Sequence, residues 1–284
     1  MVVLLAPVLL AIASLVVVGP SARRLHPRAA AWLTVCAISA VFLSLLASSW
    51  ILSLALLSGV PFLHRLLAWC LHPMSHARLE ARWVGAPALV VALATTLHLK
   101  RVVAAWWRDR VAGVAGVRVV ADRRPLAYVE AGRRGSVVVS TGMLTALRPV
   151  ERQAMLAHET AHLRHRHDRF LAIGHLISGI PLVGHRVHDH LHFALERWAD
   201  EDAALAVGDR AVVAHAVARA ALAVNDMSVG ALGMAGGDVI GRVDSLLCAP
   251  RRRVPPHAFG LFAVVGVATL VQVHHLPEIL QAVC

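Results

Sequence analysis

The sequence predicts an α-helical multi-pass membrane protein whose long polar region is mainly helical and carries a small β-sheet. The chain has 284 residues, of which 58% are hydrophobic, and its mean hydropathy is +0.65. Soluble domains are usually about 45–50% apolar, so this excess indicates a membrane protein. Several apolar runs also approach or exceed the roughly 17–25 residues needed to cross the hydrocarbon core of a bilayer.

Four segments have the length and composition of membrane spans: about residues 1–19, 31–59, 84–99 and 256–276. The first lacks the basic residues that precede the apolar core of a signal peptide, so we expect an uncleaved span there. Residues 61–71 carry His64 and Arg65 and are expected to form an amphipathic segment at the membrane surface. The predicted regions are 1–99 with three spans, 100–254 as a polar region, and 255–284 with a fourth span and short tail.

Positive charge beside the apolar runs predicts how the protein is oriented in the cell membrane. The formal net charge is +11, and the polar region is flanked by Lys100-Arg101 at one end and Arg251–Arg253 at the other. Basic residues near span ends favour the cytoplasmic side, so we expect the polar region to face the cytoplasm. No nucleic-acid motif is found, and the predicted partner of this charge is the lipid bilayer.

The polar region shows short strand signals followed by helical ones. Strands are expected at Val117–Ala121, Leu126–Glu130 and Ser136–Ser140, because these are short runs rich in β-branched residues and turn residues lie between them. A helix is expected from Pro149 onward and another from about Val187 to Val207. The apolar run Phe170–Gly184 is short for a span, so it is predicted to be a buried or re-entrant helical hairpin.

The motif His158-Glu159-Thr160-Ala161-His162 predicts a zinc centre. On a helix His158 and His162 lie one turn apart on one face and can bind the same ion. Glu159 would project beside the open coordination position, where it can take a proton from the attacking water and pass it to the leaving amine. A chance match in a histidine-rich chain is the alternative, but the small residues beside the motif favour a packed helix. The four scattered cysteines suggest neither a disulfide framework nor a thiolate site.

A catalytic zinc site needs a third protein ligand, and Glu196 is the favoured candidate. Glu196 and Asp200 share one face of the second helix, with Asp200 expected to orient a ligand histidine and Glu201 and Asp202 expected to be solvated. The alternatives left open are Asp168 and a third histidine from His185, His188 or His192.

Two further histidines, His165 and His215, could also contribute to the predicted site. His165 falls near the metal face, but with Arg164, Arg166 and His167 it is expected to form a polar stretch that faces lipid headgroups or a carboxylate. His215 lies on the apolar helix Ala211–Val224 and could hydrogen-bond a transition-state oxyanion, although a packing role is favoured.

Three stretches resemble the BlaR/MecR-type integral-membrane metallopeptidases, which are related to the HtpX-type gluzincins: Val137–Gly142 (VVVSTG), Met155–His162 (MLAHETAH) and Glu196–Ala204 (ERWADEDAA). The resemblance implies a zincin-type fold, zinc bound by His158, His162 and Glu196, and Glu159 as catalytic base in a cytoplasmic peptidase region. Antibiotic-sensing members of this family carry an extracellular domain after the fourth span and act on a repressor. The present sequence stops at Cys284, so direct β-lactam sensing is not expected.

The sequence therefore predicts a membrane zinc endopeptidase with one zinc per chain and a protein or peptide substrate, either a transcriptional repressor or a membrane protein. The strand Ser136–Ser140 is expected to offer an edge to which a substrate segment adds as a further strand. The alternative is a non-proteolytic signalling or scaffold protein with a structural zinc site, which would have no need of Glu159. The oligomeric state is not predicted.

Overall fold

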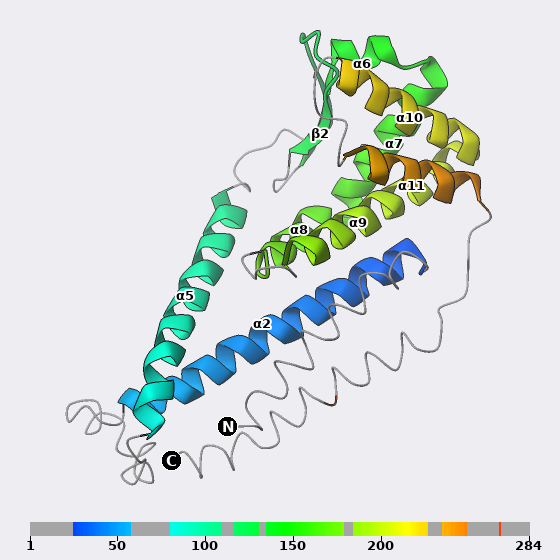
Figure 1. Ribbon diagram of the computed structural model, residues 1–284. Coiled ribbons are helices and arrows are strands. Elements are labelled where there is room, and N and C mark those ends of the chain that lie inside the picture. The colour runs from blue at the N-terminus through cyan, green and yellow to red at the C-terminus, as the bar shows by residue number, and fades with distance from the viewer. Residues whose placement is uncertain are drawn as a thin grey trace.

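The computed structural model describes residues 25–57, 80–108, 116–130, 135–178, 184–226 and 235–248, together with Val267. The expected span at residues 1–19 and the amphipathic segment at 61–71 lie outside these residues, as does the fourth span apart from Val267. Figure 1 shows two long helices beside a group of shorter helices, with a small sheet at one end of that group.

The two long helices are α2 (Pro27–Leu57) and α5 (Glu80–Arg108). Within them, Pro27–Ser53 and Gly85–Arg108 are long and apolar enough to cross a membrane by length and composition. They correspond to the second and third expected spans, so the described residues contain two candidate spans and the multi-pass architecture is not confirmed. Helix α5 also continues past residue 99, because its last nine residues contain neither glycine nor proline to end it.

Helix α2 packs against the shorter helices as well as against α5. Buried positions Ala31, Val35 and Ile38 recur at helical spacing and join one hydrophobic core with Leu191 and Leu195. In Figure 1, α2 runs alongside the helices α8 and α9. This core therefore crosses the boundary at residue 99 that the sequence predicted between membrane and polar regions.

The sheet consists of β1 (Gly116–Val120), β2 (Ala127–Glu130) and β3 (Ser136–Ser140), close to the three expected strands. The strand order is β1-β3-β2, with β3 parallel to β1 and antiparallel to β2. The expectation that Ser136–Ser140 is an edge strand is therefore wrong. All five residues of β3 are buried, because an unbroken Val-Val-Val run is suited to the centre of a sheet.

In the described part of the chain, six helices follow the sheet. They are α6 (Thr141–Ala146), α7 (Pro149–His165), α8 (His167–His175), α9 (Gly184–Val207), α10 (Arg210–Asp226) and α11 (Ala235–Leu247). The expected helix starts at Pro149 and near Val187 are confirmed to within a few residues. Helix α7 ends where Arg166 adopts a left-handed conformation with φ of 55°, which turns the chain into α8.

The apolar run Phe170–Gly184 is divided between two elements. Helix α8 ends at His175, a turn follows at residues 176–178, and Gly184 begins α9, while residues 179–183 lie outside the described part. Phe170 and Ile177 are buried in the core that α2 and α9 share. The described part of the run is thus buried at four positions (Phe170, Gly174, Ile177 and Gly184), and the helices that pack together here are α8 and α9.

Candidate metal centre

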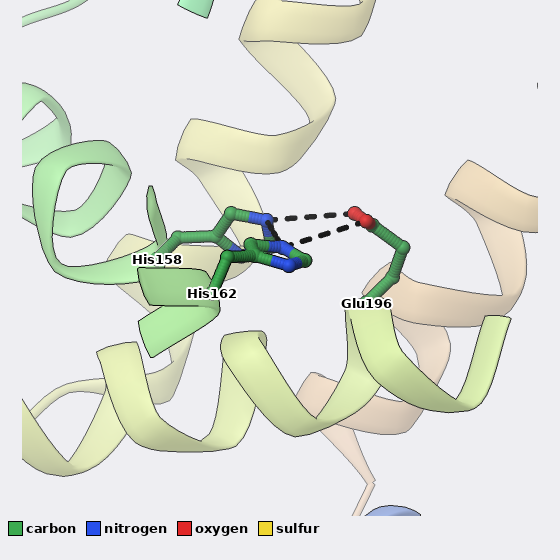
Figure 2. Close-up of side chains that lie close together, drawn as sticks. All are labelled: His158, His162 and Glu196. Atoms are coloured by element: carbon green, nitrogen blue, oxygen red, sulfur yellow. Dashed lines mark hydrogen bonds and ion pairs between the residues drawn. The ribbon is translucent and has the colours of Figure 1, made fainter. Parts of the chain in front are cut away.

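Helices α7 and α9 bring two imidazoles and one carboxylate together. His158 and His162 lie one turn apart on α7, and their Nε2 atoms are 3.1 Å from each other. Glu196 of α9 places Oε2 3.4 Å from Nε2 of His158 and Oε1 3.5 Å from Nε2 of His162. Figure 2 shows the carboxylate facing both rings across the gap between the two helices.

These three side chains fit a zinc ion by geometry and by donor type. One ligand atom from each lies within 4.8 Å of the other two. A tetrahedral zinc ion with ligands about 2.0–2.1 Å away requires about 3.3–3.4 Å between neighbouring ligand atoms. The two Nε2 atoms are 3.1 Å apart, and each faces a different Glu196 oxygen at 3.4 or 3.5 Å, so all three distances are close to this length. Two histidines and one glutamate also form a known catalytic zinc ligand set that leaves the fourth position open.

Asp200 lies behind His158 and is almost completely buried. Its Oδ1 is 2.9 Å from Nδ1 of His158, so the carboxylate can hold the imidazole with Nε2 turned toward Glu196. A buried carboxylate requires a positive partner. Arg242 of α11 supplies it by donating from Nε to Asp200 Oδ2 at 2.8 Å and from Nη2 to Oδ1 at 2.7 Å.

Arg242 was not identified from the sequence, although it also touches the candidate metal ligand set. Its Nη1 is 2.7 Å from Oε2 of Glu196. Gly241 allows this approach, because a Cβ at that position would lie 3.1 Å from the Phe193 ring of α9. The available sequence signal was a single arginine in a short helix that also carries Asp238 and Asp244, and nothing in that helix indicates that Arg242 meets acids of α9.

The ionisation of the metal-free centre follows from burial and from this charge arrangement. Burial lowers the pKa of His158, but hydrogen bonds with Asp200 and Glu196 outweigh burial and raise the pKa to about 10. Burial and the neighbouring His158 charge lower the pKa of His162 to about 4. Burial would raise the pKa of Glu196, yet the His158 hydrogen bond and the Arg242 charge hold it well below its ordinary value. Without metal, His158 is therefore protonated, and both His158 and Arg242 face Glu196 with positive charge.

His167, at the start of α8, contacts the second histidine of the motif from behind. Its Nδ1 is 2.9 Å from Nδ1 of His162, and only 1% of the residue is exposed. Burial and the nearby His162 lower the pKa of His167 to about 3, so the ring is neutral. A neutral His167 can accept the Nδ1 proton of His162 and leave the Nε2 lone pair of His162 facing Glu196. His167 is thus a buried neighbour of the centre and not part of a polar stretch.

The other candidate ligands lie apart from this group. The Asp168 carboxylate is 3.4 Å from Nε of Arg166 and lines a separate cavity between α5 and α8. His185 is exposed, and His188 packs against the ring of His175. His192 comes closer, with Nε2 3.9 Å from Oε1 of Glu196, but its side chain is 52% exposed.

Three polar residues near the centre differ from their expected settings. Asp202 forms ion pairs with Arg164 and with His165, whose Nε2 is 2.6 Å from Asp202 Oδ2. Glu201 is paired with a nearby arginine, so neither acid is freely solvated as the sequence analysis expected. His215 is exposed on α10 and does not line the cavity that reaches His158 and Glu196. It therefore has neither the packing role nor the oxyanion role considered for it.

A cavity of about 320 Å³ opens onto His158 and Glu196, and Glu159 also lines it. Burial is the main cause that raises the pKa of Glu159 above its ordinary value. A carboxylate with a raised pKa beside a metal position is well suited to accept and return a proton near neutral pH. The arrangement can therefore hold a metal ion and move a proton at a surface that a substrate can reach.

A partly buried His-His-Glu group on two packed helices, with an adjacent glutamate, is typical of a zinc-peptidase site. Residues 94–230 match the model of Peptidase family M48, so this part of the chain is similar to the M48 peptidases, which are zinc-dependent. The match ends before α11 and therefore does not include Arg242. No curated protein and no solved structure matched the chain.

Proposed function

We propose that this protein is a membrane zinc endopeptidase that hydrolyses peptide bonds of a protein substrate, with Glu159 as general base. The observation that carries the proposal is the convergence of His158, His162 and Glu196 at the wall of a cavity that Glu159 also lines. The match of residues 94–230 to the M48 family model supports metallopeptidase activity, and the two apolar helices support a membrane location.

In this proposal His158, His162 and Glu196 hold the zinc ion, which supplies Lewis acidity toward a substrate carbonyl and toward water. Glu159 accepts the proton that the attacking water loses and returns it to the departing amine. Asp200 fixes the orientation of His158, and His167 fixes that of His162. Arg242 holds the Glu196 and Asp200 carboxylates in place.

The substrate segment is proposed to bind in an extended form along β2. Strand β2 is an edge of the described sheet, and its first residue, Ala127, lines the cavity beside the centre. Main-chain pairing with an edge strand gives affinity that does not depend on side chains. A transcriptional repressor or a membrane protein is the proposed substrate. A BlaR/MecR-type role and a cytoplasmic orientation of the peptidase region are part of the same proposal.

The decisive experiment replaces Glu159 with glutamine in the full-length protein. Glutamine is nearly isosteric and Glu159 is not in the ligand group, so zinc content and thermal stability should remain as in the wild type. Cleavage of an unfolded protein such as casein should fall by about 10²–10⁴-fold, because the amide cannot accept the proton.

Glu201→Gln serves as the matched control, since Glu201 lies on the same helix as Glu196 but pairs with Arg210 outside the centre. Normal cleavage by a zinc-loaded Glu159→Gln protein would refute the mechanism. If the zinc-loaded wild type cleaved neither casein nor candidate repressors, a non-proteolytic scaffold with a structural zinc site would be the better description.

A further inference from the structure

The cavity beside the metal centre is apolar over most of its wall. It extends from the sheet and α6 across α7 to α10 and α11. Its apolar lining consists of small aliphatic residues and two methionines, and includes Met143, Ala154, Met155 and Val239. At about 320 Å³ it lies at the lower end of ligand pockets, a size suited to one or two side chains of an extended peptide.

Helix α10 forms one complete side of this cavity. Val213, Ala216, Val217, Ala220 and Ala221 line it, at the spacing that places residues on a single helical face. Three of these five are alanines, so the helix leaves space where larger side chains would fill the cavity. Met143 and Met155 lie on the other elements, and their flexible thioethers can adapt to side chains of different shape.

Among the described residues, charged groups line the cavity only at its metal end. They are His158, Glu159, Glu196 and Arg242, and the arginine is already engaged by the carboxylates of Glu196 and Asp200. Away from the metal end, no described wall residue carries a charge that could pair with an acidic or basic substrate side chain. Such a side chain would lose its hydration there without compensation.

We infer that this cavity is a specificity pocket that accepts a bulky apolar side chain, such as Leu, Met or Phe, next to the peptide bond being cleaved. The inference rests on the proposed peptidase function and adds the substrate class to it. Pairing along β2 would position the main chain, and the α10 face would select the side chain. In a hydrophobic pocket one methylene changes specificity by about 10–200-fold, so a preference for apolar over charged residues should be at least tenfold.

Binding is tested first, in a form of the protein that does not cleave. Full-length, zinc-loaded Glu159→Gln protein is titrated with fluorescein-labelled Gly/Ser peptides that differ at one central position, carrying Phe, Leu, Ala, Asp or Lys. We expect the Phe and Leu peptides to bind at least tenfold more tightly than the Asp and Lys peptides. Equal affinity for all five peptides would overturn the inference.

Variants on α10 then test whether this helix forms the pocket. Ala220→Leu and Ala221→Leu should each weaken binding of the Phe peptide relative to the Ala peptide by about tenfold, because the added side chain fills the cavity. Ala218→Leu is the matched control, since Ala218 is half-buried on the same helix but does not line the cavity. Zinc content and melting temperature are measured for each variant. An unchanged Phe-to-Ala ratio in both folded cavity variants would overturn the assignment to α10.

Cleavage by the wild-type protein separates this inference from the proposed function. A peptide library analysed by mass spectrometry should show cuts beside apolar residues. Cuts without such a preference would leave the peptidase function standing and remove the pocket. If the Glu159→Gln protein preferred apolar peptides and the zinc-loaded wild type cut none, the pocket would stand and the peptidase function would fall.

Discussion

At the scale of single residues, Arg242 balances the charge of two buried carboxylates. Its guanidinium contacts Asp200 through two nitrogens and Glu196 through a third, and its side chain is largely buried. In the metal-free protein the cations facing these carboxylates are Arg242 and protonated His158. A bound zinc ion would add positive charge at the same place, so the contribution of Arg242 to stability should depend on the metal.

Arg242→Met is therefore predicted to destabilise the metal-free protein more than the zinc-loaded protein. Breaking a buried ion pair by removing one partner typically costs about 3–5 kcal/mol, and zinc would offset part of this loss. Melting temperatures in EDTA and in zinc measure the difference. Arg242→Lys keeps the charge but not the paired hydrogen bonds, so its melting temperature should lie between those of the wild type and Arg242→Met. Equal losses with and without zinc would mean that Arg242 does not balance the charges of this centre.

The third ligand gives a second prediction at this scale. Glu196→Ala should remove most bound zinc, because a catalytic zinc site uses three protein ligands. His192→Ala and Asp168→Ala should retain it, since neither belongs to the group of converging ligand atoms. Zinc per chain, measured by atomic emission after dialysis, distinguishes these outcomes. Full zinc content in Glu196→Ala together with loss of zinc in His192→Ala would show that His192 is the third ligand in place of Glu196.

At the scale of elements, ion pairs at the start of α7 position this helix, which carries two of the candidate metal ligands. The Glu151 carboxylate is fully buried, and it accepts from the backbone N of Arg148 at 2.9 Å and from Nε of the same arginine at 2.9 Å. Nε of Arg219 on α10 is 3.2 Å from Oε2 of the same carboxylate. Glu151 thus connects the start of α7 to α10, the helix that lines the cavity.

Glu151→Gln should lower stability by about 1–3 kcal/mol, because two arginines would lose a charged acceptor. Burial alone would raise the pKa of Glu151, but the Arg148 hydrogen bonds and the two arginine charges lower it overall. A lowered pKa in the folded state means that the stabilisation is present above the unfolded pKa of about 4.3 and is lost as the pH falls below it. As the pH is lowered below about 5, the wild-type melting temperature should therefore fall faster than that of the variant. Parallel curves would exclude this contribution.

At the scale of the whole molecule, α2 joins a candidate membrane helix to the helices of the metal centre. It shares a hydrophobic core with α9, the helix that carries Glu196 and Asp200. The candidate membrane helix α2 and the helices of the candidate metal centre are thus packed together over one face of α2. If α2 spans a bilayer as proposed, this contact and the orientation of α2 determine where the centre lies relative to it.

The orientation predicted from the basic flanks can be tested by cysteine labelling. Cys36, Cys70, Cys248 and Cys284 are first replaced by serine, and a single cysteine is placed at Leu205, which is 82% exposed on α9. An impermeant maleimide should label this cysteine in lysed cells and not in intact cells, because the polar region should face the cytoplasm. Labelling in intact cells would reverse the orientation.

The sequence by itself determined the features that depend on local spacing. A four-residue interval places His158 and His162 on one helical face, and short β-branched runs predict the three strands. The same reasoning selected Glu196, because Glu196 and Asp200 lie on the inward face of α9. Their metal and catalytic roles stay predictions, but the structure brings Glu196 to the two histidines.

Only the tertiary structure decided the features that depend on contacts between distant segments. Arg242 is 42 residues from Asp200 in the chain, and no periodicity within α11 indicates which acids it meets. His167 follows the end of α7 and reaches His162 only because the chain reverses at Arg166. The central place of β3 follows from pairing with strands on both sides, which a single strand's sequence does not specify. The apolar cavity likewise exists because α7, α10 and α11 meet around it, since no single helix encloses a space.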